Sequence, residues 1–474
     1  MLQPFADAHR IYHVIEPALR APSVYNTQPW SFRITADDRI ELRASTGGGA
    51  GDGPGPGRWD LLLHSPAPGP WAREYAISCG AALLNLRLAV RVLGHDPVVT
   101  LAPDPSGDPG LLASVEIVTG RTHEASAVEQ ELYEAIWQRH TDRWPFSDTP
   151  VRAGILVEME RAAAREHGWL RLLHGPFARA WLTVAAHADS VLAAARDTAG
   201  DIAPAGDLAG AQSFDALVAQ FREELAQWTG ASETGYGIPV ADLGPRPAKG
   251  RAPVRDFRLG EPGPGDTEAE ADEITTGGAG SGGVPRARFE RHPQLMMLFT
   301  DRDEPADWLR AGQALQRALL AATSMGVSAS FLTQPLELAD LAFQYDPQDS
   351  HASRLIGSAG RRGLPSLHRA ADASQRTSTS PVERRGYVRR RLLGATPWLE
   401  VPQMVIRVGY PQDGAEPDLR TPRAEPDIVD ARTDPPRRLP RPPAGGGPDG
   451  TGAGGGRDAG TLQAGAREGG RFPA

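Results

Sequence analysis

The chain of 474 residues has a single cysteine, Cys79, and a single lysine, Lys249. One cysteine excludes a disulfide framework and any zinc site built from cysteines. Cys79 lies in an apolar run, so we expect a buried structural thiol. Lys249 stands in the sequence Pro-Ala-Lys-Gly. It suits neither a Walker-type phosphate loop, which needs Gly-Lys-Ser/Thr, nor a pyridoxal enzyme, which needs a Schiff-base lysine.

Long hydrophobic runs are also missing. No stretch reaches the ~18 uninterrupted apolar residues of a membrane-spanning helix, because Asn85, Arg87 and Arg91 interrupt the most apolar segment, 76–94. The N-terminus shows no signal-peptide pattern. The formal net charge of −9 disfavours sequence-independent binding to nucleic acid, which needs a basic face. We therefore expect a cytoplasmic protein that binds neither membranes nor nucleic acid.

No catalytic triad, carboxylate pair or metal-binding cluster stands out, and we assign no catalytic side chain. The histidines are scattered, and no His-x-x-x-His pair lies on a predicted helix with a carboxylate partner. The Gly-rich run 277–283 lacks the strand before it and the helix after it that a dinucleotide-binding loop requires. If the protein is an enzyme, a bound cofactor is expected to carry the reactivity.

Hydrophobic periodicity predicts alternating helices and strands over much of the chain. Gly and Pro, at 53 and 43 residues, concentrate in segments that interrupt this pattern. The first is a lid-like or partly disordered excursion at 230–286, and the second is a polar insertion at 346–398. A third, from 431 to 474, is predicted to be a disordered tail. Helices are predicted over 4–19, 71–94, 124–138, 151–167, 177–197, 213–228 and 304–325, and strands near 31–34, 40–43, 98–101, 115–118, 169–173, 295–299, 328–332 and 403–410.

An internal repeat links two of the predicted helices. Both contain Gly-x-Ala-Leu-x4-Leu-Ala-x4-Gly, and each feeds a strand after its last glycine. The small residues would let two such helices pack closely. Either the chain contains a duplicated α/β unit, with halves packed like a fused dimer, or two Ala- and Leu-rich helices agree by chance. The repeated positions are Gly80, Ala82, Leu83, Leu88, Ala89 and Gly94 in one copy and Gly312, Ala314, Leu315, Leu320, Ala321 and Gly326 in the other.

Short polar side chains gather between Pro22 and Pro29, where Ser23, Asn26 and Gln28 offer a hydroxyl and two carboxamides. A carboxamide donates and accepts hydrogen bonds, as recognition of a flat heterocycle requires. Alternatively, the segment is a helix-ending turn whose polar side chains cap local amides.

A second polar segment pairs Arg139 with Arg143 around Thr141. Two guanidinium groups four residues apart can converge on one phosphate. Alternatively, both arginines are solvated at the end of a helix, where the helix dipole favours cations.

These segments resemble motifs of the flavin-dependent nitroreductase superfamily, and more closely its Acg-like branch of fused two-lobe proteins. Residues 21–32 are similar to the Pro-Ser-x-x-Asn-x-Gln-Pro-Trp segment, which in that superfamily reaches the flavin ring from the opposite subunit. Residues 139–146 are similar to the Arg-x-Ser/Thr-x-Arg-x-x-Phe element, which grips the FMN phosphate and the ring edge.

Two further segments extend the resemblance. Residues 325–331 are similar to the helix-to-strand step before the loop whose backbone amide faces flavin N5. That loop would here contain Thr333 and Gln334. Residues 402–411 resemble the closing strand, and Arg420 or Arg423 after it would complete the phosphate clamp.

The resemblance implies an α+β, nitroreductase-like fold with two fused lobes, 1–120 and 121–430, that form a pseudo-dimer. In ordinary dimers of this superfamily each subunit carries both motifs, so each motif occurs twice. Here each lobe carries only one of the two. We therefore expect one FMN per chain at the junction between the lobes. Ser23, Asn26 and Gln28 would address the ring, and Arg139, Thr141, Arg143 and a C-terminal arginine would hold the phosphate and ribityl.

Three functions are compatible with this resemblance. The first is an NAD(P)H-dependent oxidoreductase that passes electrons to a small-molecule acceptor such as a nitroaromatic or a quinone. The second is an FMN-sequestering or storage protein with a closed lid and little reductase activity. The third is a relative that has lost the cofactor. With the two lobes fused, a monomer is expected.

Overall fold

The computed structural model describes residues 4–45, 72–104, 107–194, 214–229, 235–247, 255, 257, 286–345, 400–412 and 421–441. All the elements described below lie in one compact unit, Met1–Pro440. Of the second unit, Arg441–Ala474, only Arg441 is described. The predicted insertion 346–398, most of the predicted excursion 230–286 and the tail beyond residue 441 lie outside the described residues.

One sheet has the strand order β12-β11-β1-β2-β4-β3. Its neighbouring strands are antiparallel except for β1 and β11, which run parallel with Phe32 opposite Ile428. The strands are β1 (Trp30–Ala36), β2 (Arg39–Ala44), β3 (His95–Leu101), β4 (Leu111–Thr122), β11 (Ile428–Asp430) and β12 (Arg437–Arg438).

Two short C-terminal strands belong to this sheet. Strand β11 joins β1, so Ile428–Asp430, which lie in the predicted second lobe, extend the sheet of the N-terminal strands. Strand β12 follows within residues that were predicted to be disordered, and Leu439 after it is buried. Neither strand was predicted, because a strand of two or three residues leaves no periodic signal.

The second sheet has the order β5-β8-β10-β9 and is antiparallel throughout. Its central strand β10 is buried at all nine positions, as expected for a strand covered on both faces. The strands are β5 (Trp169–Leu172), β8 (Gln294–Thr300), β9 (Ser328–Phe331) and β10 (Val401–Gly409); a separate parallel pair is formed by β6 (Arg246–Pro247) and β7 (Arg286–Ala287).

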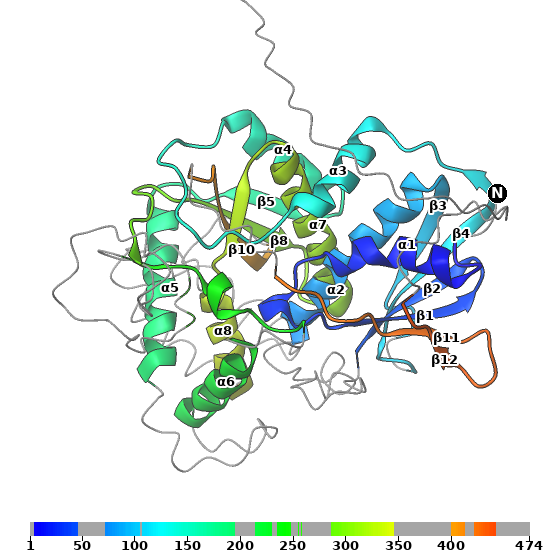
Figure 1. Ribbon diagram of the computed structural model, residues 1–474. Helices are drawn as coiled ribbons and strands as arrows, with labels where there is room; N and C mark the ends of the chain where they lie inside the picture. Colours follow the sequence, from blue (N-terminus) through cyan, green and yellow to red (C-terminus); the bar gives the residue numbers. More distant parts are fainter. Residues whose placement is uncertain are drawn as a thin grey trace, which may run out of the picture. The chain divides into compact units, whose positions relative to one another are not determined.

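Two long helices, α2 (Ala72–Val92) and α7 (Pro305–Ser324), pack against each other in the core (Figure 1). Helix α2 contacts β2, β3 and β4 of the first sheet, whereas α7 contacts β8, β9 and β10 of the second. Helix α2 is long and apolar enough to cross a membrane by composition alone, but 83% of its most apolar stretch is buried inside the protein. It is therefore a core helix of this unit.

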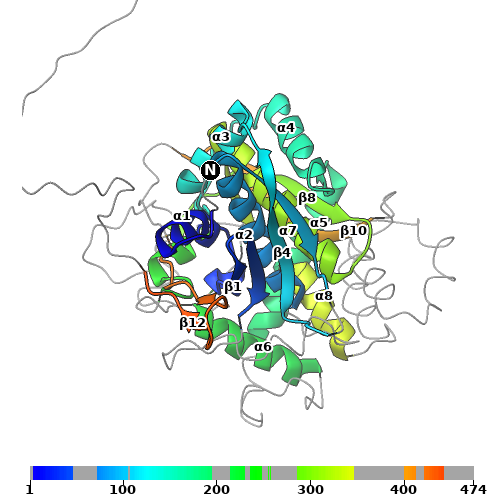
Figure 2. The ribbon, with the colours of Figure 1, turned by 90° about the vertical axis from the view of Figure 1, so that its right-hand side faces the viewer.

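The remaining helices surround this core, as the two views show (Figures 1 and 2). Most begin and end within a few residues of their predicted limits, so the α+β class is confirmed. The exception is α8, which starts at Gln334 inside the expected loop, with Pro335 in its first turn, where proline is tolerated. The helices are α1 (Ala8–Leu19), η1 (Val24–Asn26), α3 (Ala127–Gln138), α4 (Ala153–Ala164), α5 (Pro176–Ala194), α6 (Phe214–Trp228), η4 (Val240–Leu243) and α8 (Gln334–Tyr345).

Candidate functional site

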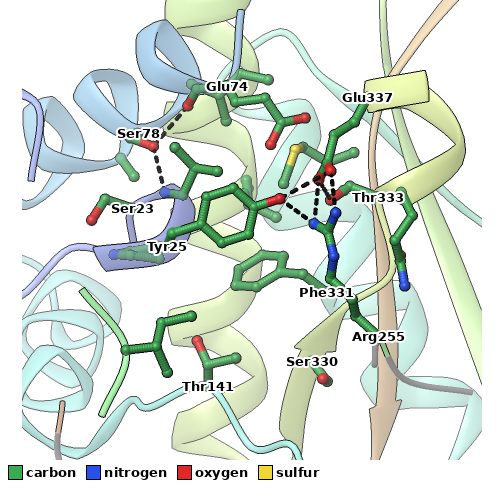
Figure 3. A pocket seen from close by; sticks show the side chains of 18 of the residues that line it. Ser23, Tyr25, Glu74, Ser78, Thr141, Arg255, Ser330, Phe331, Thr333 and Glu337 are labelled. Atoms are coloured by element: carbon green, nitrogen blue, oxygen red, sulfur yellow. Dashed lines mark hydrogen bonds and ion pairs between the residues drawn. The ribbon is translucent and has the colours of Figure 1, made fainter. Parts of the chain in front are cut away.

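A cavity of about 770 Å³, including its open mouth, lies where the two central helices meet the turn after α1, strands β9 and β10 of the second sheet, and the start of α8 (Figure 3). This main cavity has a largely apolar floor, to which α2 contributes Ile77 and Ala81, α7 contributes Leu315 and β10 contributes Met404.

A second pocket of about 590 Å³, here called the basic pocket, adjoins the main cavity. Four arginines line it: Arg20, Arg139, Arg143 and Arg423. The two pockets share part of their lining, so the main cavity with its apolar floor lies directly beside a cationic pocket. The shared residues are Pro22, Ser23, Thr141, Arg143 and Ile238.

Arg139 and Arg423 are half-buried in the wall of the basic pocket. Arg139 Nη2 donates to the carbonyl of Arg20 at 2.8 Å, and Arg423 Nη1 donates to Asn26 Oδ1 at 2.7 Å. Burial and the charge of Arg423 lower the pKa of Arg139 to about 9, and burial and the charge of Arg20 lower the pKa of Arg423 to about 10. Within the described residues, neither forms an ion pair with a carboxylate.

Arg143 stands between the two pockets. Its Nη1 donates to the carbonyl of Asp242 at 3.0 Å, and its guanidinium lies 5.3 Å from the centre of the Phe257 ring. Burial lowers the pKa of Arg143 to about 10. Thr141 is held by a β-bridge to Ala329, which places its side chain in the lining of both pockets.

The turn after α1 is held in an uncommon backbone conformation. Tyr25, Asn26 and Gln28 have φ angles of 45°, 56° and 46°, in the left-handed region that costs a non-glycine residue energy. Ser23 Oγ accepts from the Gln28 amide at 3.1 Å, and Ser23 lines both pockets. Contacts with surrounding residues hold this turn in its strained conformation.

The two carboxamides of the turn bind backbone. Asn26 Nδ2 donates to the carbonyls of Gly237 and Pro422, both at 3.0 Å. Gln28 Nε2 donates to Gly235 O at 2.7 Å, and its Oε1 accepts from the Ala424 amide at 3.1 Å. Asn26 lines the basic pocket, whereas Gln28 lines neither of the two pockets. Both were expected to address the ring, but here they join the turn to two distant segments.

Thr333 and Gln334, which the resemblance assigns to the loop beside the flavin, line the main cavity. Thr333 Oγ1 donates to Glu337 Oε1 at 3.1 Å. The Gln334 side chain is 1% exposed, and neither atom of its carboxamide has a hydrogen-bond partner among the described residues. Arg420, the alternative C-terminal arginine, lies outside the described residues, so Arg423 is the arginine of this segment that the structure places at the site.

A charged group in the main cavity was not predicted from the sequence. Tyr25 Oη donates to Glu337 Oε2 at 2.9 Å, and Arg255 Nη2 lies 2.8 Å from the same oxygen (Figure 3). Arg255 also donates to Tyr25 Oη. Burial raises the pKa of Tyr25, so the phenol stays protonated. Arg255 lies in a Gly- and Pro-rich stretch, and nothing in its spacing indicated a buried partner.

Glu74 in the first turn of α2 was also missed. It lines the main cavity together with Ile77, Ser78 and Ala81, which follow at helical spacing on the same face. Its signal was present in the sequence, because an acidic residue inside a long apolar helix needs a reason to be buried. Among the described residues, no group of three or more His, Cys, Asp or Glu side chains could hold a metal ion.

The sequence was compared with known proteins. No family model matches the chain. The Mycobacterium tuberculosis (H37Rv) protein named "Putative NAD(P)H nitroreductase Rv3131" is 26% identical over 421 residues, which span 89% of this chain and 91% of the relative. "Putative NAD(P)H nitroreductase acg" of the same organism is 28% identical over 337 residues, 69% of this chain and 81% of the relative.

These matches confirm the resemblance to the nitroreductase superfamily and its Acg-like branch. A third relative from the same organism, the uncharacterized protein Rv3127, is 27% identical over 330 residues, 68% of this chain.

Proposed function

We propose that this nitroreductase-like protein binds one FMN per chain and acts as an NAD(P)H-dependent oxidoreductase in the cytoplasm. The observation that carries the proposal is that the main cavity, with its apolar floor, shares part of its lining with a pocket lined by arginines. A flavin mononucleotide has the same division, with a flat ring system at one end and a phosphate at the other.

The basic pocket suits a phosphate. Arg139, Arg143 and Arg423 line it, and none of them forms an ion pair with a carboxylate of the described residues. Half-buried cations without a counter-ion are costly, and a bound phosphate would compensate them through charge-assisted hydrogen bonds. Thr141 adds a hydroxyl beside them.

The main cavity suits the ring. Its floor is apolar, and Gln334 leaves a donor and an acceptor without partners. When bound, the flavin supplies the hydride chemistry. The side chains of the chain bind and orient it: Ser23 and Thr141 lie at the junction of the two pockets, and the carboxamides of Asn26 and Gln28 hold the surrounding backbone in place.

We infer further that the chain is a fused pseudo-dimer and functions as a monomer. Helices α2 and α7 carry the repeated sequence and pack together, and each faces a different sheet. The lining of the site comes from both halves, because Ser23 precedes α2, whereas Thr141 and Arg143 follow α3. A site built in this way occurs once per chain.

One observation favours storage of FMN as the alternative function. Arg255 and Phe257 line the main cavity, and Arg255 is anchored there by Glu337 and Tyr25. Side chains that are held in place across a cavity restrict the entry of a second substrate, such as NAD(P)H, to a flavin bound there. A protein that keeps FMN behind these residues would hold the cofactor and turn over slowly.

The test is anaerobic reduction of the purified protein. We expect a yellow protein whose flavin absorbance is bleached by NADH or NADPH under argon and restored by a nitroaromatic or a quinone. Flavin that is retained but not bleached by either nicotinamide would favour storage. A colourless protein that takes up no FMN on reconstitution would contradict both functions.

A further inference from the structure

A charged cluster forms one wall of the main cavity. Arg255 pairs with Glu337 at 2.8 Å. Arg73 divides its guanidinium between Glu74 at 2.6 Å and Asp340 at 3.1 Å, and also donates to the carbonyl of Gln403. Glu74 therefore shares its cation with a second carboxylate and with a backbone acceptor.

The two glutamates of this wall differ in their hydrogen bonds. Glu337 accepts from Tyr25, Thr333 and Arg255 and uses both of its oxygens. Among the described residues, Glu74 accepts only from Arg73, through Oε1, and none donates to its Oε2. Figure 3 shows the Glu74 carboxyl on the cavity side of α2, turned toward Tyr25 and Glu337.

The surroundings of Glu74 favour its neutral form. The residue is 3% exposed, and burial is the main reason that its pKa is raised to about 7. The nearby carboxylates act in the same direction and the guanidinium groups oppose them. The charged and titratable groups that face it are Arg73 on its own helix, Glu337 and Asp340 on α8, Arg255, and Tyr25 on η1. Near neutral pH, Glu74 can therefore hold a proton and release it.

We propose that Glu74 is a catalytic residue of this site and donates the proton that accompanies hydride transfer to the acceptor. This inference rests on the proposed function. For a quinone, one hydride from the reduced flavin and one proton from Glu74 give the hydroquinone. The O–H bond of the carboxyl breaks, the proton goes to a quinone oxygen, the flavin is reoxidised, and water reprotonates the carboxylate.

The first experiment locates the proton without turnover. Infrared difference spectra of the purified protein, recorded across a pH titration, should show the carbonyl band of a protonated carboxyl that disappears as the pH rises through about 7. The band should be missing in Glu74→Gln and present in Glu158→Gln, whose carboxyl is exposed. A band that persists unchanged in Glu74→Gln overturns the proposal, whether or not the protein holds flavin.

The second experiment compares two acceptors after the flavin has been reduced with dithionite, so that nicotinamide plays no part. A quinone needs a proton, whereas ferricyanide takes only an electron. Glu74→Gln should slow reoxidation by the quinone about a hundredfold, as expected for the loss of a general acid, and should leave reoxidation by ferricyanide unchanged. Glu74→Asp, which keeps an acid, should recover part of the quinone rate.

The outcomes separate the donor role from the proposed function. Equal rates with the quinone in the wild type and Glu74→Gln, or an equal loss with both acceptors, overturn the donor role while the flavin function stands. If no preparation binds flavin, the proposed function fails and the donor role fails with it. The infrared titration still shows in that case whether Glu74 carries the proton.

Discussion

Gly80 and Gly312, which occupy the same position in the two copies of the repeat, lie against each other where helices α2 and α7 cross. A Cβ added to Gly312 would stand 2.8 Å from the Cα of Gly80, and one added to Gly80 would stand 3.0 Å from the Cα of Gly312. Each added carbon would also overlap a backbone carbonyl of the other helix, that of Ile77 or Leu309. Contact between equivalent residues is the mark of a two-fold interface.

Gly312→Ala should therefore destabilise the protein. The new methyl group meets backbone that cannot move aside, and overpacking of this kind typically costs about 1–3 kcal/mol. Gly154→Ala is the matched control, because a Cβ there meets nothing within 4 Å in helix α4 and alanine is the better helix former. Urea unfolding measures both, and a Gly312→Ala variant as stable as Gly154→Ala would contradict this packing.

Arg143→Ala should release FMN without unfolding the chain. A charge-assisted hydrogen bond is worth about 1.5–3 kcal/mol, so the dissociation constant of FMN should rise about ten- to a hundredfold. Fluorescence titration of the protein with FMN measures the change. Arg161→Ala is the control, since Arg161 is exposed and pairs only with Glu158 among the described residues. Wild-type flavin occupancy in Arg143→Ala would contradict the assignment of the basic pocket to phosphate.

Arg139→Met should move stability and affinity in opposite directions. Burial and the neighbouring Arg423 disfavour the charge on Arg139, so methionine should stabilise the flavin-free protein by about 1 kcal/mol. The same change should weaken FMN binding, because a phosphate ligand is lost. Thermal unfolding with and without FMN measures both effects. A variant that is less stable than the wild type without FMN would indicate that the arginine serves the fold.

Glu129 makes stability depend on pH at the start of α3. Although burial acts to raise its pKa, hydrogen bonds from Ser126, Arg91 and His123 lower it to about 2 from the usual 4.5. A lowered pKa stabilises the folded state above pH 4.5, and this contribution is lost as the pH falls toward 2. Glu129→Gln should therefore be less stable than the wild type at neutral pH. The difference, measured by denaturant unfolding, should shrink steadily below pH 4.5, and a constant difference would contradict the assigned cause.

Arg255→Ala distinguishes the two candidate functions. It removes the side chain that Glu337 and Tyr25 hold in the main cavity. If this anchor restricts access, the variant should be reduced by NADPH at least several times faster than the wild type under argon. Stopped-flow absorbance of the flavin measures this rate. An unchanged rate would show that Arg255 does not limit access, and the argument for storage would lose its support.

Much of the fold could be predicted from the sequence because its longest elements have strong periodicity. Helices α2 and α7 end close to their predicted limits, and the contact of Gly80 with Gly312 agrees with the expected role of small residues in the repeat. Strand β11 could not be predicted. Its three residues pair with β1 across almost the whole chain, and such long-range pairing has no local signal.

Some residues of the site could be predicted from the sequence and others could not, again because long-range packing leaves no local signal. Residue types indicated that Arg139 and Arg143 could bind an anion, and both line the basic pocket. The carboxamide of Gln28 was assigned to the ring on chemistry alone, yet its hydrogen bonds go to Gly235 and Ala424. Glu74 has no motif around it. Its position inside a long apolar helix was a signal of burial, but its pairing with Arg73 and its place in the main cavity depend on the packing of α2, which the local sequence does not reveal.

The parallel pairing of β1 with β11 has a consequence for how the protein is made. Tyr12 donates to the carbonyl of Leu439, a residue 427 positions later in the sequence, and Phe32 stands opposite Ile428. On the ribosome, helix α1 and strand β1 emerge long before their partners are synthesised. The edge of β1 that β11 covers must therefore stay open through most of translation, and a nascent chain is exposed at that edge to chaperones and to wrong strand partners.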